Sequence, residues 1–215
     1  MQHATHCSAF QILKAECLAL LGRYQEAQEI ANDVVMKEPT NADALFVRGM
    51  CLYYQDNAEK AFQHFQRVLQ YSPDHTRAKS FYKTAKSLQT KKEAGNTAFK
   101  AGKWQEAHDL YTESLTIDPN NKSINSALYF NRATTLSKVC SLFLIDLIWN
   151  SIYFEYLKMN KLDECIDDCT KAVDLEDGYV KAYLRRAKCF MDKEEFEKAI
   201  ADYEKVYKLD KTKGK

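Results

Sequence analysis

The sequence predicts an all-α fold, a superhelix built from repeated pairs of antiparallel helices. Ala, Leu, Lys, Glu and Gln are abundant and favour helix, whereas 215 residues contain only 6 Gly and 3 Pro. The prolines also mark a period. Pro39 and Pro73 stand 34 residues apart, and Pro119 follows 46 residues later, which is 34 plus 12. A fixed period of this length indicates a chain of similar structural units.

A 34-residue period is typical of tetratricopeptide repeats, each of which is a helix pair. Because one pair cannot bury its own apolar face, neighbouring pairs stack into a superhelix whose concave groove is lined by the first helices. We expect two repeats in residues 8–75, a helical linker in residues 76–87, which lack Gly and Pro, and three repeats in residues 88–213. The individual repeats are predicted at 8–41, 42–75, 88–121, 126–179 and 180–213.

Small residues at two fixed places of each repeat support this register. A bulky side chain at either place would push the paired helices apart. The eighth places hold Ala15, Gly49, Gly95, Ala133 and Ala187, and the twentieth places hold Ala27, Ala61, Ala107, Cys165 and Ala199. A generic helical bundle would not keep this pattern in five frames.

The fourth repeat fits the frame only if residues 139–158 are an insertion between its two helices. These residues are far more apolar than an ordinary loop, but Asp146 and Asn150 interrupt them, so they make a poor membrane span. We interpret them as translated intron, because Lys-Val-Cys at 138–140 can be encoded by a splice-donor-like sequence. An added interaction element is the alternative. If translated, the insertion would extend the first helix or form a hairpin.

The net charge bears on whether the protein binds nucleic acid or membranes, and the cysteines bear on its cellular compartment. The 31 Lys and Arg against 30 Asp and Glu give a net charge of +1, which offers no support for nucleic-acid or membrane-surface binding. Seven cysteines without paired spacing favour a reducing, cytoplasmic location, with the nucleus as a further option, and the N-terminus has no targeting pattern. We expect Cys165 and Cys169 to be buried thiols rather than metal ligands.

The sequence gives no indication of an enzyme. It contains no Gly-rich phosphate loop, metal-ligand cluster or nucleophile elbow, so we expect no catalytic residue, metal or cofactor. His64 and His108 fall on second helices, where a hydrogen-bonded or exposed histidine is the ordinary expectation. A protein-binding function is therefore favoured, in a chain that we expect to be monomeric.

Five polar residues on first helices form the candidate site: Lys92, Asn96, Asn131, Lys181 and Arg185. Four-residue spacing places Lys92 on the helical face of Asn96, and Lys181 on that of Arg185. Since these faces line the predicted groove, cations and amides would converge there on the carboxylates of a peptide. Arg can bind a carboxylate through two parallel hydrogen bonds, while Lys acts as a point charge.

The alternative is that these cations belong to an ordinary solvated helix face. The two asparagines argue against this, because Asn is a mediocre helix former with no evident structural reason to stand in mid-helix. A general scaffold that binds other partners remains the rival function.

The motifs Lys-Glu-Ala-Gly-Asn (92–96), Tyr-Phe-Asn-Arg-Ala (129–133) and Val-Lys-Ala-Tyr-Leu-Arg-Arg-Ala (180–187) resemble the dicarboxylate clamp of chaperone-binding tetratricopeptide proteins. All five clamp residues of that family match here. The stretches 41–54 and 203–207 resemble the DnaJ homologues that carry such repeats, and the resemblance covers nearly all of the chain except 139–158.

The resemblance implies a co-chaperone that binds the acidic Glu-Glu-Val-Asp tails of heat-shock proteins 70 and 90. It also implies a J domain downstream, but this chain has no His-Pro-Asp, so we interpret it as a fragment or an incomplete gene model. In the first two repeats the clamp places hold Leu13, Asp43 and Val47. No second clamp is therefore expected there.

Overall fold

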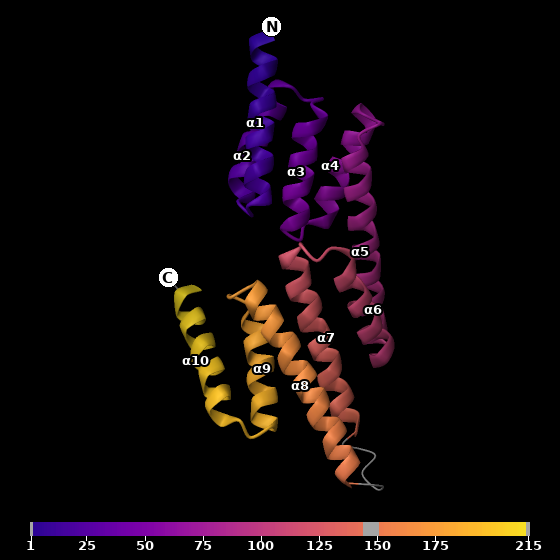
Figure 1. The fold of residues 1–215 in the computed structure, drawn as a ribbon, viewed down its shortest axis with the longest axis vertical. Coiled ribbons are helices and arrows are strands. Elements are labelled where there is room, and N and C mark those ends of the chain that lie inside the picture. The colour runs from indigo at the N-terminus through magenta and orange to yellow at the C-terminus, as the bar shows by residue number, and fades with distance from the viewer. Residues whose placement is uncertain (1, 144–150, 214–215) are drawn as a thin grey trace. The chain divides into compact units, whose positions relative to one another are not determined.

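Helices account for the regular structure of the part of the chain that can be described. The computed structural model describes the backbone of residues 2–143 and 151–213 and the side chains of residues 8–139 and 159–211. These residues form ten α-helices and no strand, as the all-α prediction requires (Figure 1). In chain order they are α1 Gln2–Leu20, α2 Tyr24–Lys37, α3 Ala42–Tyr54, α4 Ala58–Tyr71, α5 Thr76–Lys100, α6 Trp104–Ile117, α7 Lys122–Phe143, α8 Ser151–Leu175, α9 Val180–Asp192 and α10 Phe196–Lys213.

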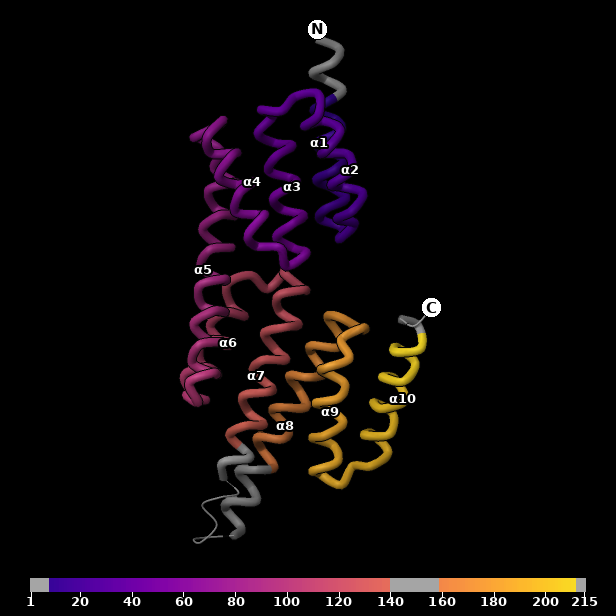
Figure 2. Tube along the Cα trace, turned by 180° about the vertical axis from the view of Figure 1, so that it is seen from behind, coloured from indigo at the N-terminus to yellow at the C-terminus, as the bar shows by residue number. Residues whose placement is uncertain are grey.

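The chain divides into two units, residues 1–89 and 90–215, and the boundary falls within α5. Residues 76–87, for which a helix was predicted, belong to α5. Consecutive helices pack against one another from α1 to α4 in unit 1 and from α6 to α10 in unit 2, and first helices also meet, α1 with α3 and α7 with α9. In unit 2 the helices α7 to α10 follow one another side by side in both views (Figures 1 and 2). This is the stacking that the repeat frame predicts.

The small residues of the repeat frame lie at the helix contacts, as predicted. All ten residues at the eighth and twentieth places are buried. A Cβ atom added to Gly49 would lie 2.7 Å from the ring of Phe65, and one added to Gly95 would lie 2.7 Å from the ring of Tyr111. Each glycine therefore lets an aromatic ring of the second helix lie against the backbone of the first.

The helix ends repeat as well. Each proline stands two residues beyond the end of a second helix, namely after Lys37, Tyr71 and Ile117, because proline cannot continue a helix. Two residues beyond the end of four first helices stands a residue with positive φ: Gly22 (79°), Asp56 (57°), Gly102 (74°) and Glu194 (62°). In each case the next residue donates its N–H to a carbonyl five residues back, which closes the helix end.

Two buried ion pairs in unit 2 were not predicted. Arg132 of α7 donates to both carboxylate oxygens of Asp168 in α8, at 2.8 and 2.7 Å. Arg186 of α9 makes the same paired contact with Asp202 of α10, at 2.9 and 2.7 Å. Both arginines occupy the seventh place of a repeat, next to a candidate site residue. They fix the rotation of α7 and α9 about their axes, because two parallel hydrogen bonds define one geometry.

His64 departs from the expectation of a hydrogen-bonded or exposed histidine. It is half-buried in α4, and its Nδ1 atom is buried without a hydrogen-bond partner among the described residues. His64 stands at the place where the fourth and fifth repeats have aspartate, and Arg48 of α3 stands at the matching arginine place. Burial, aided by Arg48 and Arg67, lowers the pKa of His64 to about 4.

The insertion prolongs helices on both sides of it. The first helix α7 extends to Phe143, and α8 begins at Ser151. Residues 144–150, where a hairpin would turn, lie outside the described residues. The expected buried thiols are confirmed, since Cys165 and Cys169 have no exposed surface and pack with Cys189. Among the described residues, no helix is long and apolar enough to cross a membrane.

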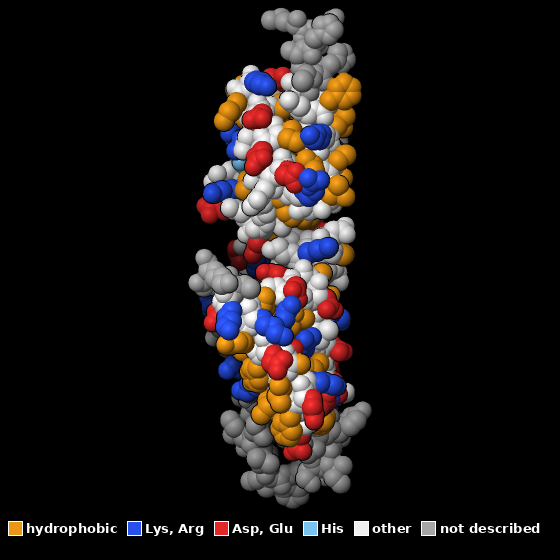
Figure 3. Space-filling view, turned by 90° about the vertical axis from the view of Figure 1, so that its left-hand side faces the viewer, with side chains coloured by type: hydrophobic (Ala, Val, Ile, Leu, Met, Phe, Trp, Pro, Cys, Tyr) orange, Lys and Arg blue, Asp and Glu red, His pale blue; other side chains and the backbone are white. Residues whose placement is uncertain are grey.

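The last helix exposes apolar side chains on one face. Phe196, Ile200, Tyr203 and Tyr207 of α10 are between 45% and 62% exposed, whereas Ala199 is buried against α9. Figure 3 views the molecule from this side and shows orange side chains gathered on unit 2. The packed face of α10 is formed by Ala199, Asp202, Val206 and Leu209.

Candidate functional site: amides and cations on the first helices of unit 2

The five candidate residues lie on three first helices of unit 2. Lys92 and Asn96 belong to the last turns of α5, Asn131 lies in the middle of α7, and Lys181 and Arg185 lie in α9. Asn96, Asn131 and Arg185 are half-buried, and Lys181 is exposed.

The two asparagines are in direct contact. Asn131 donates from Nδ2 to Oδ1 of Asn96 at 3.3 Å. Tyr111 of α6 donates its hydroxyl to the same Oδ1 atom at 2.8 Å. Because Oδ1 of Asn96 accepts both bonds, the Nδ2 group of Asn96 is at the opposite edge of the amide and is available as a donor. The structure thus joins two of the five predicted residues, from helices of neighbouring repeats, into one hydrogen-bonded pair.

A pocket of about 270 Å³ opens beside this pair. Its lining contains both amides, a lysine, a threonine and three aromatic rings but no carboxylate: Asn96, Phe99, Lys100, Tyr111, Phe130, Asn131 and Thr134. The site can therefore donate hydrogen bonds to an anion without repelling it, and it offers an apolar wall to a neighbouring side chain.

The three predicted cations lie outside the lining of this pocket. Arg185 of α9 donates from Nη1 to the hydroxyl of Ser137 in α7 at 3.2 Å. This bond joins the cation to the helix that carries Asn131. Lys92 stands one turn before Asn96 on α5, and Lys181 stands one turn before Arg185 on α9. The structure therefore places the amides together and the cations on the neighbouring turns and helix.

Adjacent residues explain why these side chains face as they do. Arg132 follows Asn131, and Arg186 follows Arg185. Consecutive residues of a helix point about 100° apart. Because Arg132 and Arg186 are held in buried ion pairs by the second helices, Asn131 and Arg185 are turned to a different side of their helices. The ion pairs therefore position the site without belonging to it.

Tyr111 is the functional residue that sequence reasoning missed. Its side chain is fully buried, and burial raises its pKa to about 12. The hydroxyl therefore stays protonated at neutral pH and acts as a donor to Asn96. The available signal was positional, since Tyr111 occupies the place at which Phe65 stands in the second repeat. Its role in orienting an amide depends on a contact fifteen residues away in sequence, which the pattern did not reveal.

No group of three or more His, Cys, Asp or Glu side chains that could hold a metal ion occurs in the part of the chain that the structure describes. The polar side chains that line the pocket of unit 2 are amides, a lysine and hydroxyl groups.

Comparison with known proteins supports the repeat fold. Residues 42–75 and 89–121, and separately residues 180–213, match family models described as tetratricopeptide repeat. The crystal structure of the P58(IPK) TPR domain superposes on 94% of this chain and 50% of that chain with a TM-score of 0.70 and 20% sequence identity. This similarity concerns the fold alone.

Curated relatives are similar over the whole chain. DnaJ homolog subfamily C member 7 of Homo sapiens is 51% identical over 213 residues, which are 99% of this chain and 39% of that protein. The DnaJ homolog subfamily C member 7 homolog of Dictyostelium discoideum is 36% identical over 214 residues, which are 100% of this chain and 36% of that protein. The chain thus spans less than two fifths of the length of these relatives.

Proposed function

The chain is a tetratricopeptide-repeat protein homologous to DnaJ homolog subfamily C member 7, and from this premise we propose that it is a co-chaperone adaptor. Unit 2 binds the acidic C-terminal tails of heat-shock proteins 70 and 90. The observation that carries the proposal is the bonded pair of Asn96 and Asn131, held by Tyr111 on the rim of a pocket without carboxylates.

The amides supply neutral donors for the terminal carboxylate. Oδ1 of Asn96 is occupied by two donors, so its Nδ2 group can donate to a bound oxygen. Asn131 uses one N–H for Asn96 and retains a second. Neutral donors fit this position well, because a further cation would repel Lys100 in the same pocket.

The cations supply charge for the second carboxylate, which belongs to the last side chain of an Asp-ending tail. Arg185 binds it through two parallel hydrogen bonds after leaving Ser137, and Lys92 and Lys181 add positive charge from the flanking helices. Exchanging a neutral hydroxyl for a carboxylate is favourable, since hydrogen bonds to charged groups are roughly twice as strong as neutral ones.

The aromatic wall accounts for the apolar residue next to the terminal aspartate. Phe99 and Phe130 line the pocket beside the two amides. A Val side chain that enters this pocket loses its water contact while the adjoining carboxylate meets Asn96. A tail that combines two carboxylates with one apolar side chain therefore fits better than a purely acidic peptide.

The expected affinity is modest. Charge-assisted hydrogen bonds contribute about 1.5–3 kcal/mol each, and ordering a flexible peptide offsets part of this sum. A dissociation constant near the micromolar range, about −8 kcal/mol, follows. The affinity should fall as salt is added, because the partners are exposed charges.

Substitutions test the proposal by isothermal titration with a peptide that ends in Glu-Glu-Val-Asp. Asn131→Ala and Arg185→Ala should each weaken binding at least tenfold. Lys208→Ala, which removes one positive charge from the second helix α10 outside the groove, is the matched control and should change it less than twofold. If all three variants bound as the parent does, unit 2 would be a scaffold for other partners.

We also propose a cytoplasmic location and a monomeric state for this adaptor. The location is supported by the thiols held in the core of unit 2, which suit a reducing compartment. Sedimentation analysis at micromolar concentration tests the monomer.

A further inference from the structure

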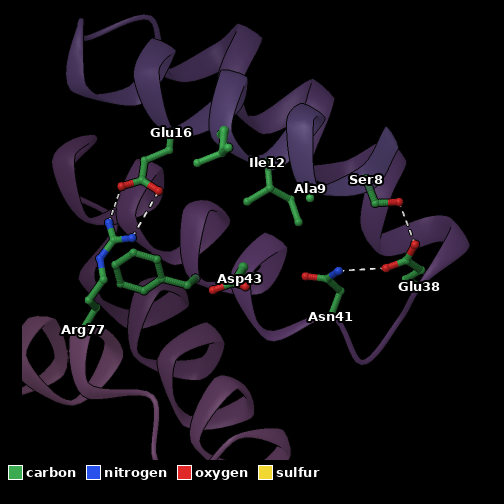
Figure 4. Close-up of a pocket in the computed structure, with 10 residues that line it drawn as sticks. Ser8, Ala9, Ile12, Glu16, Glu38, Asn41, Asp43 and Arg77 are labelled. Carbon is green, nitrogen blue, oxygen red and sulfur yellow. Dashed lines mark hydrogen bonds and ion pairs between the residues drawn. The ribbon is translucent and has the colours of Figure 1, made fainter. Parts of the chain in front are cut away.

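Unit 1 contains a groove of about 430 Å³ on the side of its first helices (Figure 4). We call it the acidic groove. It is lined by residues of α1, α3, the connection before α3 and the start of α5: Ser8, Ala9, Ile12, Leu13, Glu16, Glu38, Asn41, Asp43, Phe46 and Arg77. Its volume lies within the range of ligand-binding pockets, about 300–1,000 Å³.

The floor of the groove is apolar. Ile12 and Phe46 are buried, and Leu13 of α1 is 57% exposed at the groove. The guanidinium of Arg77 lies 4.8 Å from the centre of the Phe46 ring, which covers one side of the floor. An apolar side chain of a partner could therefore bury Leu13, which the chain itself leaves in water.

One carboxylate of the rim is held ionised mainly by neutral hydrogen-bond donors. Glu38 accepts a hydrogen bond from the hydroxyl of Ser8 at 2.6 Å and another from Nδ2 of Asn41 at 2.8 Å, as Figure 4 shows. These two bonds, that of Ser8 first, lower the pKa of Glu38. The charge of the neighbouring Lys37 also lowers this pKa, but among the described residues no Lys or Arg forms an ion pair with Glu38. The carboxylate thus has no cation in direct contact.

A second carboxylate, that of Asp43, is also met by a neutral donor. Nε2 of His75 lies 3.2 Å from Oδ1 of Asp43, and Nδ1 of His75 accepts the backbone N–H of Ala78 at 3.0 Å. Because Nδ1 is an acceptor, the ring proton is on Nε2 and is donated to Asp43. The carboxylate of Asp43 is 69% exposed and has room for a cation.

The third carboxylate, Glu16, is paired with Arg77, which donates to both of its oxygens. Three carboxylates against one guanidinium leave the groove with a formal charge of −2, counting His75 as neutral. The pocket of unit 2 has the opposite character, with Lys100 and no carboxylate in its lining.

Residues at equivalent places of the repeats also differ between the two units. The places that hold Lys92, Asn96 and Asn131 in the third and fourth repeats hold Ile12, Glu16 and Val47 in the first and second. At these three places a cation and two amides are replaced by two apolar side chains and a carboxylate. The chemistry that suits an acidic tail in unit 2 is thus exchanged for one that suits a basic and apolar ligand.

We propose that the acidic groove docks a cationic peptide segment of a partner protein, in which Lys or Arg stands next to an apolar side chain. The apolar side chain packs on Leu13, Ile12 and Phe46. The cation bridges Glu38 and Asp43, whose charges face the groove from two sides. This site is independent of the proposed clamp, since it uses none of its residues and selects the opposite charge.

Three capped peptides test the proposed ligand chemistry on the full chain by fluorescence anisotropy. Acetyl-(Leu-Lys)₃-amide carries both features, acetyl-(Ser-Lys)₃-amide only the charge, and acetyl-(Leu-Ser)₃-amide only the apolar side chains. All lack a terminal carboxylate, so they do not meet the requirement of the clamp. The first should bind at least fivefold more tightly than the second, and the third should not bind. Equal binding of the first two, or no binding of the first, would overturn the proposal.

Paired substitutions test the location. Glu38→Gln with Asp43→Asn removes two charges. The new amide at 38 can accept from Asn41 and donate to the hydroxyl of Ser8, and the new amide oxygen at 43 can accept from His75. Glu29→Gln with Asp33→Asn makes the same charge change on exposed α2 residues outside the groove. The first pair should weaken binding of the Leu-Lys peptide at least tenfold and the second less than twofold. Equal losses would mean that the peptide responds to overall charge, which contradicts the proposal.

Discussion

The hydroxyl of Tyr111 lies 2.8 Å from Oδ1 of Asn96 and donates a hydrogen bond to it. A buried second-helix side chain thereby sets the direction of an amide that we place in the tail-binding site. Tyr111→Phe should keep the ring packing but let the Asn96 amide rotate. We expect this variant to bind a Glu-Glu-Val-Asp peptide about three- to tenfold more weakly, because the loss of one hydrogen bond costs about 1 kcal/mol. Isothermal titration measures the change.

Tyr183→Phe is the control for this change. It also removes a hydroxyl that donates to another side chain, Asp177, at 3.0 Å in unit 2. Tail binding should not respond to it. If both variants weakened binding equally, Tyr111 would act through the stability of unit 2 rather than through Asn96.

A methyl group at Gly95 should strain the contact between the first and second helices of the third repeat. Its Cβ atom would lie 2.7 Å from the Tyr111 ring, so Gly95→Ala should lower the free energy of unfolding by about 1–2 kcal/mol, with overpacking partly offset by better helix propensity. At Gly178 an added Cβ meets nothing within 4 Å. Gly178→Ala should be neutral or slightly stabilising in the same urea titration, and a larger loss there would contradict this interpretation.

The ion pair between Arg132 and Asp168 should matter far more than a surface pair. Asp168 is buried, and its loss would leave the Arg132 charge without a partner. Asp168→Ala should therefore cost about 3–5 kcal/mol of unfolding free energy. Glu26, whose pair with Arg23 is exposed, serves for comparison, and Glu26→Ala should leave the denaturation midpoint unchanged. Similar denaturation midpoints for the two variants would show that the buried ion pair contributes no more to the free energy of unfolding than the exposed one.

His64 should make the protein sensitive to acid. Its pKa is lowered to about 4 in the folded chain, below the usual value of 6.5. Between these values the unfolded chain binds a proton that the folded chain does not. Stability is thus complete above pH 6.5 and is lost as the pH falls toward 4, by about 1–2 kcal/mol after solvent screening.

The variant His64→Gln isolates this contribution. Urea unfolding at pH 7 and pH 5 should show a smaller loss for His64→Gln than for the parent, since all other histidines are common to both chains. His64→Asp should stabilise the chain at pH 7 by giving Arg48 the partner that Arg132 and Arg186 have. An equal pH dependence of parent and His64→Gln would contradict the assignment.

Removal of residues 139–158 should leave tail binding unchanged within twofold. Asn131 precedes the deletion by eight residues, and the other proposed contacts come from α5 and α9. Titration of the Glu-Glu-Val-Asp peptide against chains with and without these residues measures the effect. A change of tenfold or more in either direction would show that the insertion controls the groove.

The repeat architecture could be predicted from the sequence because its signals are local and recur. Proline follows the second helix in three frames, and small residues occupy the eighth and twentieth places in all five frames. Gly22 and Gly102 end first helices for the same local reason, a positive φ. Asp56 and Glu194 take the same conformation without being glycine, so the sequence offered no signal for them.

The site was predictable only in part. The repeat frame placed Asn96 and Asn131 on first helices. The hydrogen bond from Tyr111 and the bond of Arg185 to Ser137, however, join residues whose side-chain directions depend on packing. The ion pairs that turn α7 and α9 were missed for the same reason. The environment of His64 was not predicted. It can be interpreted only by comparison with the ion pair of Arg132 and Asp168, in which the matching place of the fourth repeat holds a carboxylate.

The central claim, that unit 2 binds a free peptide carboxylate through Asn96 and its neighbours, is tested most directly by one comparison. Isothermal titration of the Glu-Glu-Val-Asp peptide with a free C-terminus should give a dissociation constant near the micromolar range, and the C-terminally amidated peptide should bind at least tenfold more weakly. Equal affinity for the two peptides would show that the terminal carboxylate is not what the groove recognises.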